Sequence, residues 1–291
     1  MIDIGRVFAT SWAMFRQRFW LLLGMFAVFF AIQMVGSFVL GIVMALMGAA
    51  GAVGIGAGFD DPASFTGMSV VFILVMILFY GSYAVLALVQ QAAMVTIASP
   101  LEEPSFGAAM ARGFKSVLPF IVISLILGVG YLALGAAVFA VAGVAGLSGG
   151  TAGGIVGLVL LLLFMPVIIY LACRLSVLIG VVAVDQVFNP IAAIKRSWAV
   201  TEGRVLGIFL ATLAFMLLSL VILGLPFLLM FGSMLGSGGD PGAAAIGVVL
   251  LGFLTFIPLL VLYTMFASAY MAALHSELTG GGAERLEEVF A

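Results

Sequence analysis

Few side chains in this sequence could do chemistry, and one of them is a charge inside an apolar segment. Arg174 lies within a predicted membrane-spanning segment, eleven positions before Asp185 (185 − 174). A continuous helix would place it roughly 16 Å deep, at 1.5 Å per residue. Intramembrane charges often mark functional sites, so Arg174 is a candidate contact for lipid phosphate or another anion in a cavity. The alternative is that its side chain extends to the headgroups or pairs with a polar group there.

The histidine and the cysteine predict neither a catalytic nor a metal site. His275 and Cys173 are the sole residues of their types, and the carboxylates are confined to the predicted loops and tail. A zinc site needs about four N, S or O ligands. No serine has a histidine or carboxylate at a spacing that would activate it as a nucleophile. We therefore expect no catalytic residue, no metal and no cofactor, and we do not expect an enzyme.

Two glycine clusters invite comparison with phosphate-binding loops. Gly48 to Gly58 and Gly149 to Gly154 lack the Lys-Ser/Thr ending and the flanking strand that such loops need. We expect turns in these places. The sequence also has no compact basic domain outside the apolar segments, so nucleic acid is not an expected partner.

The composition predicts an all-α, polytopic membrane protein. Hydrophobic residues make up 65% of the 291 residues and charged residues 8%, far from the composition of a soluble domain. About 20 apolar residues suffice to span a bilayer as a helix. Six such segments are expected. They begin near Phe19, Met68, Pro119, Ile155 and Arg204, with the sixth following a third glycine turn and ending near His275.

Three shorter segments have helical spacing of apolar residues and basic residues on the opposite side. The third starts with Asn189-Pro190, an N-cap residue followed by a first-turn proline. Each contains a central aromatic residue, namely Trp12, Phe114 or Trp198. We expect three amphipathic helices in the membrane interface, over about 3–18, 106–118 and 188–203.

The three aromatic residues define a repeat. They are separated by 102 (114 − 12) and 84 (198 − 114) positions, and each is followed by an apolar segment, a glycine turn and a returning apolar segment. Arg18 and Arg204 occupy corresponding positions in the first and third repeats. We expect one membrane domain over 1–291, built from three parallel hairpin repeats at about 3–98, 105–185 and 189–276, with a tail at 277–291.

Basic residues predict the orientation. Apart from Arg174, every Lys and Arg falls on one side of the proposed membrane, and the three glycine turns contain none. By the positive-inside rule, we expect a cell inner (plasma) membrane protein with both termini in the cytoplasm. Each exposed charge near anionic lipid contributes roughly 1 kcal/mol to binding. The candidate lipid or anion contacts are Trp12, Arg18, Arg174, Lys195, Arg196, Trp198 and Arg204.

The segment from Arg174 to Gly203 resembles a block in the glycerophosphoryl diester phosphodiesterase membrane-domain family. The positions that fit are Arg174, Asp185, Pro190, Ala193, Ser197, Trp198, Thr201 and Gly203. The ending SELTGGGAERLEEVFA also resembles the tail of bacterial members. The resemblance implies a stand-alone membrane module. It does not imply phosphodiesterase activity, because that activity belongs to a soluble barrel and this sequence has none.

Two functional hypotheses follow. The first is a noncatalytic bacterial inner-membrane protein that binds or organises phospholipid, or supports a protein partner that the sequence does not identify. The alternative is a transporter or permease for a lipid-derived or small amphiphilic substrate. Pro166, Pro226 and Pro258 motivate the alternative because each could kink a spanning helix.

Overall fold

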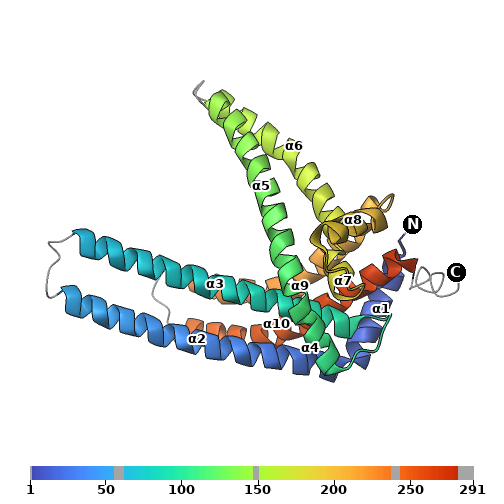
Figure 1. The fold of residues 1–291 in the computed structure, drawn as a ribbon, viewed down its shortest axis with the longest axis horizontal. Coiled ribbons are helices and arrows are strands. Elements are labelled where there is room, and N and C mark those ends of the chain that lie inside the picture. Colours follow the sequence, from blue (N-terminus) through green and yellow to red (C-terminus); the bar gives the residue numbers. More distant parts are fainter. Residues whose placement is uncertain (1, 56–61, 147–150, 237–242, 281–291) are drawn as a thin grey trace.

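The computed structural model describes residues 2–55, 62–146, 151–236 and 243–280 (Figure 1). Helices account for nearly all of these residues, and no strand occurs among them. The helices are α1 (Ile4–Gln17), α2 (Phe19–Ile55), α3 (Pro62–Ala98), α4 (Phe106–Lys115), α5 (Val117–Gly146), α6 (Thr151–Leu175), α7 (Leu178–Ala183), α8 (Pro190–Val200), α9 (Val205–Gly236) and α10 (Ala243–Leu278).

Six segments of the described chain are long and apolar enough to cross a membrane. They are Phe19–Leu46, Ile73–Ala98, Val117–Ala137, Leu162–Ala183, Val205–Leu228 and Gly247–Leu278. The share of buried residues in their most apolar windows is between 6% and 22%, so most of their side chains face outward. A surface this apolar is stable only in lipid. The chain is therefore an all-α, multi-pass membrane protein, as the composition predicts.

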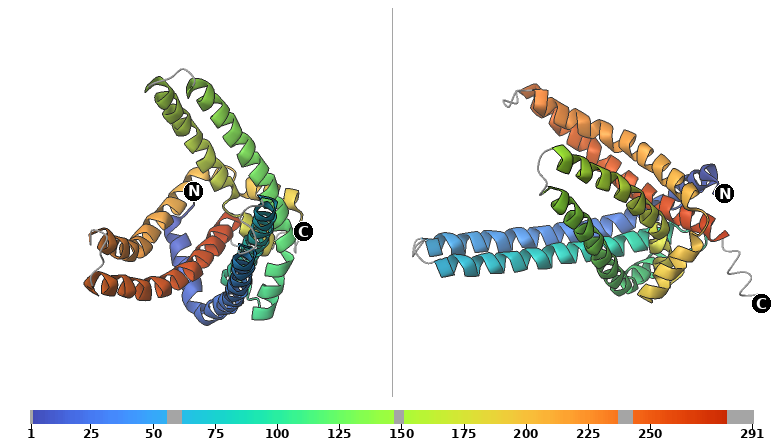
Figure 2. Two further views of the ribbon diagram at one scale, coloured as in Figure 1. Left: turned by 90° about the vertical axis from the view of Figure 1, so that its left-hand side faces the viewer. Right: turned by 90° about the horizontal axis from the view of Figure 1, so that it is seen from above.

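The long helices form three hairpins that diverge from a common base. The pairs are α2 with α3, α5 with α6, and α9 with α10. Figures 1 and 2 show the hairpins extending in different directions from the region where α1, α4, α7 and α8 gather. The two buried clusters of the core also lie at this base, drawing on residues from Val7 in α1 to Leu278 in α10. The hairpins are thus anchored at one end of the molecule.

Each hairpin follows a short helix that begins at a side-chain N-cap. Asp3 accepts a hydrogen bond from the Arg6 amide, Ser105 from the Ala108 amide, and Asn189 from the amides of Ile191 and Ala192. Such caps satisfy amides that the first helical turn leaves without partners. The caps are 102 (105 − 3) and 84 (189 − 105) positions apart, which are the offsets that the sequence predicts for the repeat. The prediction of Asn189-Pro190 as a helix start is confirmed.

The buried faces of the short helices follow the same offsets. Each helix buries a pair of small or branched residues one helical turn apart, and α1 buries Phe15 as well. These pairs are Val7 and Ser11 in α1, Ala109 and Gly113 in α4, and Ala193 and Ser197 in α8. Since the caps and the buried faces share one register, they support the prediction of three related units.

The short helices connect the hairpins to one another. Helix α4 packs on α3 of the preceding hairpin, α8 packs on α6 and α7, and α1 packs on α10 of the last hairpin. The last contact joins the two ends of the chain, because Phe8 meets Tyr270 at 5.7 Å between ring centroids and Arg6 reaches Glu277 at 3.4 Å. The three hairpins therefore share a closed ring of contacts at the base.

Three helix boundaries differ from those predicted. Helix α2 continues through Gly48, Gly51 and Gly54 to Ile55, and α3 begins at Pro62, well before Met68. Helix α6 begins at Thr151, so Gly153 and Gly154 of the second predicted turn are helical. The remainder of the first turn, residues 148–150 of the second turn, residues 237–242 of the third and residues 281–291 of the tail lie outside the described residues.

The fourth spanning segment is interrupted, so the continuous helix on which the predicted depth of Arg174 depends is not present. Helix α6 ends at Leu175, and α7 starts at Leu178. Between them, the Ser176 hydroxyl donates to the Cys173 carbonyl oxygen at 2.8 Å, a local bond that competes with helix continuation. Arg174 lies in the last turn of α6, beside the base of the molecule.

Candidate functional site

Arg174 projects from the end of α6 onto the end of α8. Its Nη1 donates to the Trp198 carbonyl oxygen at 2.9 Å, and its Nε donates to the Tyr170 hydroxyl at 3.0 Å. The guanidinium also lies 4.8 Å from the centroid of the Trp198 ring, a cation–π contact. Only 8% of Arg174 is exposed. The positive charge thus meets the negative end of the α8 dipole, where carbonyl groups lack helical partners.

The contact between α6 and α8 is reciprocal. The Ser197 hydroxyl donates to the Arg174 carbonyl oxygen at 2.8 Å, and Thr201 Oγ1 lies 3.5 Å from Arg174 Nη1. Gly203, two residues after Thr201, has a φ of +68°, a conformation that glycine adopts without strain. The residues that carry the family resemblance therefore hold one helix end against another.

Arg18 and Arg204 have the same kind of partner. Arg18 donates to the carbonyl oxygens of Ile97, Ser99 and Glu102, at and just beyond the end of α3. Arg204 donates to the Leu278 carbonyl oxygen at the end of α10, at 2.7 Å. Each arginine immediately precedes the first long helix of its hairpin and donates hydrogen bonds at the C-terminal end of the second long helix. Cations are favourable at helix C-termini for the same electrostatic reason as at α8.

A buried charge cluster joins α8 to α10 through the loop after α7. Asp185 Oδ2 lies 3.3 Å from both Arg196 Nε and His275 Nε2. His275 is fully buried, and its ring packs against Gly180, where a Cβ would come within 2.6 Å of the imidazole. Burial acts to raise the pKa of Asp185, but the hydrogen bond and charge of His275, together with Arg196, lower that pKa below its ordinary value. Asp185 is therefore held as a carboxylate.

Three basic side chains have no polar partner among the described residues. Arg16, Lys115 and Lys195 are exposed, and each belongs to a different short helix. Each of these helices also exposes a large aromatic ring, with exposed fractions of 54% for Trp12, 52% for Phe114 and 36% for Trp198. Basic and aromatic side chains together are typical of a membrane interface.

The structure divides the predicted site residues into two groups. Arg18, Arg174, Arg196 and Arg204 bind groups of the protein itself. Trp12, Trp198 and Lys195 are exposed on the short helices. Arg16 and Lys115 are exposed cations that were not among the predicted contacts, although both lie in the segments predicted to form interfacial helices. It also missed the ion pair of Asp185 with His275, which lie 90 positions apart (275 − 185) and give no local pattern.

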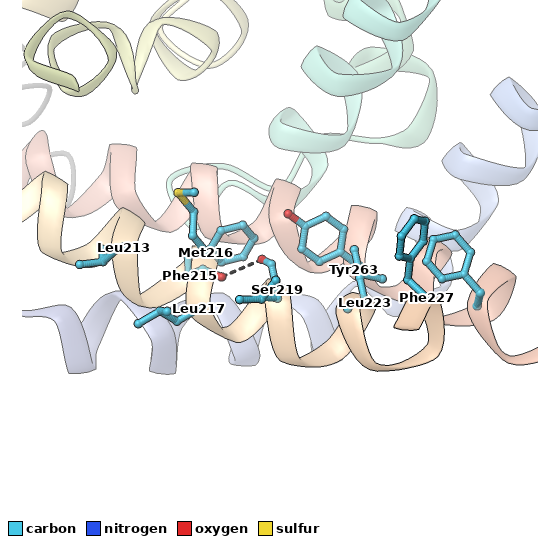
Figure 3. A pocket seen from close by; sticks show the side chains of 11 residues that line it. Leu213, Phe215, Met216, Leu217, Ser219, Leu223, Phe227 and Tyr263 are labelled. Atoms are coloured by element: carbon cyan, nitrogen blue, oxygen red, sulfur yellow. Dashed lines mark hydrogen bonds between the residues drawn. The ribbon is translucent and has the colours of Figure 1, made fainter. Parts of the chain in front are cut away.

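Two apolar grooves follow helices α9 and α10. One, of about 460 Å³, lies between these helices and the aromatic residues Trp12, Phe15 and Phe19. The other, of about 570 Å³, runs along α9 and is drawn in Figure 3. Both present almost exclusively carbon to an occupant. A third pocket at Arg18 and Glu103 is more polar.

In the described part of the chain, no three His, Cys, Asp or Glu side chains gather where they could hold a metal ion. Comparison of the chain with protein-family models, curated proteins and solved structures finds no match.

Proposed function

We propose that the chain is a noncatalytic membrane module whose base binds anionic phospholipid at the cytoplasmic face of a bacterial inner membrane. The observation that carries this proposal is the set of exposed cations. Arg16, Lys115 and Lys195 lie one on each short helix, without a polar partner among the described residues, beside exposed aromatic rings. Phosphate is the group that such a surface meets in a membrane.

The placement of charge supports the cytoplasmic orientation in this proposal. The described Lys and Arg residues lie on the short helices or at helix ends next to them, so all belong to the base. The positive-inside rule then directs the base and both described chain ends to the cytoplasm. Arg6 and Glu277, from opposite ends of the chain, form an ion pair at 3.4 Å there.

The use of the motif residues supports a noncatalytic role. In the block that resembles the glycerophosphoryl diester phosphodiesterase membrane-domain family, Arg174, Ser197 and Thr201 bond to one another, and Asp185 pairs with Arg196. These side chains stabilise the arrangement of helices. A catalytic group would instead be open to a substrate.

A transporter is the second candidate, favoured by the three prolines. Pro166, Pro226 and Pro258 lie inside α6, α9 and α10, where each removes one backbone hydrogen bond and permits bending. The two larger grooves are apolar, however, which suits acyl chains better than a polar solute. Flux of lysophospholipid or of glycerophosphodiesters through proteoliposomes would favour the transporter over the binding module.

The proposal predicts that neutralising the exposed cations removes bound lipid. The variant carries Arg16→Gln, Lys115→Gln and Lys195→Gln, and each lost charge should weaken binding of anionic lipid by about fivefold, or roughly 1 kcal/mol. Native mass spectrometry of the purified protein measures retained phosphatidylglycerol. A control with Arg16→Lys, Lys115→Arg and Lys195→Arg keeps the charges and should retain lipid. Equal retention by the two variants would contradict the proposal.

A further inference from the structure

The groove between the first and third hairpins has the size of a ligand site. We call it the α1–α9 groove. Trp12, Phe15 and Phe19 form one wall, and Phe215, Leu262 and Phe266 contribute to the other. Its volume of about 460 Å³ falls within the range of roughly 300–1,000 Å³ that is usual for small-molecule sites. The walls come from the two ends of the chain, so the groove exists only when the base is assembled.

The lining suits hydrocarbon. The Ser219 hydroxyl, a polar group in the wall, donates to the Phe215 carbonyl oxygen at 2.7 Å and needs nothing from an occupant. The Phe266 ring of one wall contacts Trp12 and Phe15 of the other, at 6.4 Å and 6.0 Å between ring centroids. The two walls therefore meet through aromatic rings. A polar ligand would leave its own groups without hydrogen bonds here. An acyl chain has no polar groups that need hydrogen bonds.

A positive charge lies close to the groove lining on α1. Trp12 is 54% exposed there, and Arg16 follows it by four residues on the same helix. At 3.6 residues per turn the two side chains point in directions about 40° apart, on one face of α1. Arg16 is exposed and has no polar partner among the described residues. An indole in the lining of an apolar groove and a guanidinium one helical turn away thus lie on one face of α1.

The groove of Figure 3 follows another face of α9. It shares Phe215, Ser219 and Tyr263 with the α1–α9 groove, so the two adjoin. Along α9 it runs from Leu213 to Phe227, fourteen residues (227 − 213) or about 21 Å. The hydrocarbon of one leaflet is about 15 Å thick, half of the whole core. The length of this groove therefore matches the acyl-chain region of one leaflet.

From these contacts we propose that the α1–α9 groove binds one anionic diacyl phospholipid, with its acyl chains along α9 and its phosphate at Arg16. This inference rests on the proposed function and assigns it to one site. Charge complementarity selects the occupant. A zwitterionic lipid would bring a second positive group next to Arg16, and an apolar helix of a partner protein would leave the guanidinium without a counter-charge.

Trp12 can report directly on the occupant. Trp20→Phe and Trp198→Phe leave Trp12 as the sole tryptophan, because the sequence contains three. This protein is reconstituted in phosphatidylcholine vesicles that contain phosphatidylglycerol, with bromine on the acyl chains of one lipid or the other. Bromine quenches the indole on contact. We expect brominated phosphatidylglycerol to bind about fivefold more strongly than brominated phosphatidylcholine, the preference that one added cation gives.

Matched variants distinguish a defined lipid-binding site from a general attraction of anionic lipid to the positively charged base. Arg16→Gln should abolish the preference for phosphatidylglycerol, whereas Lys115→Gln, which removes an exposed cation from α4, should leave it unchanged. Leu262→Phe narrows the groove and should reduce quenching, whereas Leu132→Phe on the exposed face of α5 should not. Circular dichroism checks that each variant keeps its helices. Equal loss in the two charge variants, or equal quenching by the two lipids, would overturn the inference.

The same preparations distinguish this inference from the proposed function. If the purified protein retains phosphatidylglycerol but Trp12 shows no preference, the lipid lies elsewhere on the base and only the assignment to the α1–α9 groove fails. If no anionic lipid is retained, both fail. A Trp12 that no lipid quenches, together with a second polypeptide that copurifies, would instead identify a protein helix as the occupant.

Discussion

Arginine side chains at the base act on helix ends. Arg18, Arg174 and Arg204 each donate to backbone carbonyl oxygens at or just beyond the C-terminus of another helix. Those carbonyl groups have no partners within their own helices, and in an apolar setting an unpaired carbonyl is costly. The guanidinium provides several donors in a fixed geometry and keeps its charge at all relevant pH values. These arginines therefore stabilise the fold, whatever else they contact.

Removal of the Arg18 side chain should destabilise the protein. Arg18→Ala leaves the carbonyl oxygens of Ile97, Ser99 and Glu102 without their donor. We expect the free energy of unfolding to fall by about 2–3 kcal/mol, the usual cost of hydrogen bonds to a charged group. Thermal unfolding in detergent measures the change. Arg16→Ala is the control, since its side chain is exposed without a polar partner among the described residues, and it should change stability by less than about 0.5 kcal/mol.

Asp185 should make stability depend on acid pH. Its pKa in the folded protein is lowered from an ordinary 3.8, so its carboxylate contributes stability at pH values above about 3.8. That contribution is lost as the pH falls through the lower folded pKa. Asp185→Asn should therefore be less stable by about 1–3 kcal/mol at neutral pH, with the difference from the unaltered protein shrinking in acid. Unfolding midpoints against pH for both proteins test this. A difference that is constant with pH would contradict it.

At the scale of elements, small residues set how closely the short helices approach the long ones. Gly113 of α4 faces α3, and a Cβ there would lie 2.8 Å from the Val89 carbonyl oxygen and 3.1 Å from the Ala93 Cβ. Ser11 and Ser197 occupy the corresponding positions in α1 and α8 and are fully buried. This position thus lies on the buried face of each short helix, which packs on the first hairpin for α4, on the second for α8 and on the last for α1.

Gly113→Ala should separate α4 from α3. The added methyl group overlaps backbone atoms that cannot move away alone, so we expect a loss of about 1–3 kcal/mol in the free energy of unfolding. Gly107→Ala in the same helix is the matched control, because no atom lies within 4 Å of its Cβ position. That change should be neutral or stabilise by up to about 1 kcal/mol. Similar effects of the two substitutions on thermal unfolding would argue against close packing at Gly113.

Local pattern predicted the helices well and their contacts poorly. Apolar runs predicted the six long helices, and Asn189-Pro190 predicted the start of α8, because length, polarity and capping act within a few residues. The break between Leu175 and Leu178 was missed, since it lies inside an apolar run and no proline or glycine stands in it. The partner of Arg174 was also missed, because the Trp198 carbonyl group is 24 positions away (198 − 174) and helix packing brings the two together.

At the scale of the molecule, three hairpins extend from one ring of contacts (Figure 2). The base has a buried core and ion pairs, whereas the hairpins present large apolar side chains such as Phe38, Leu132 and Leu254 to their surroundings. Polar contacts within the long helices are few. One, between Gln33 and Gln90 at 3.2 Å, joins α2 to α3. Lipid is thus expected between the hairpins, and the base alone fixes their relative positions.

The account depends most on all three short helices lying at one face of the membrane. Cysteine accessibility in whole cells tests this directly. In a Cys173→Ala background, single substitutions are Lys115→Cys and Lys195→Cys at the base, and Ser148→Cys and Ser237→Cys in the connections that follow α5 and α9. We predict that a membrane-impermeant maleimide labels positions 148 and 237 in intact cells, and positions 115 and 195 only after permeabilisation. Labelling of a base position together with a connection in intact cells would contradict the account.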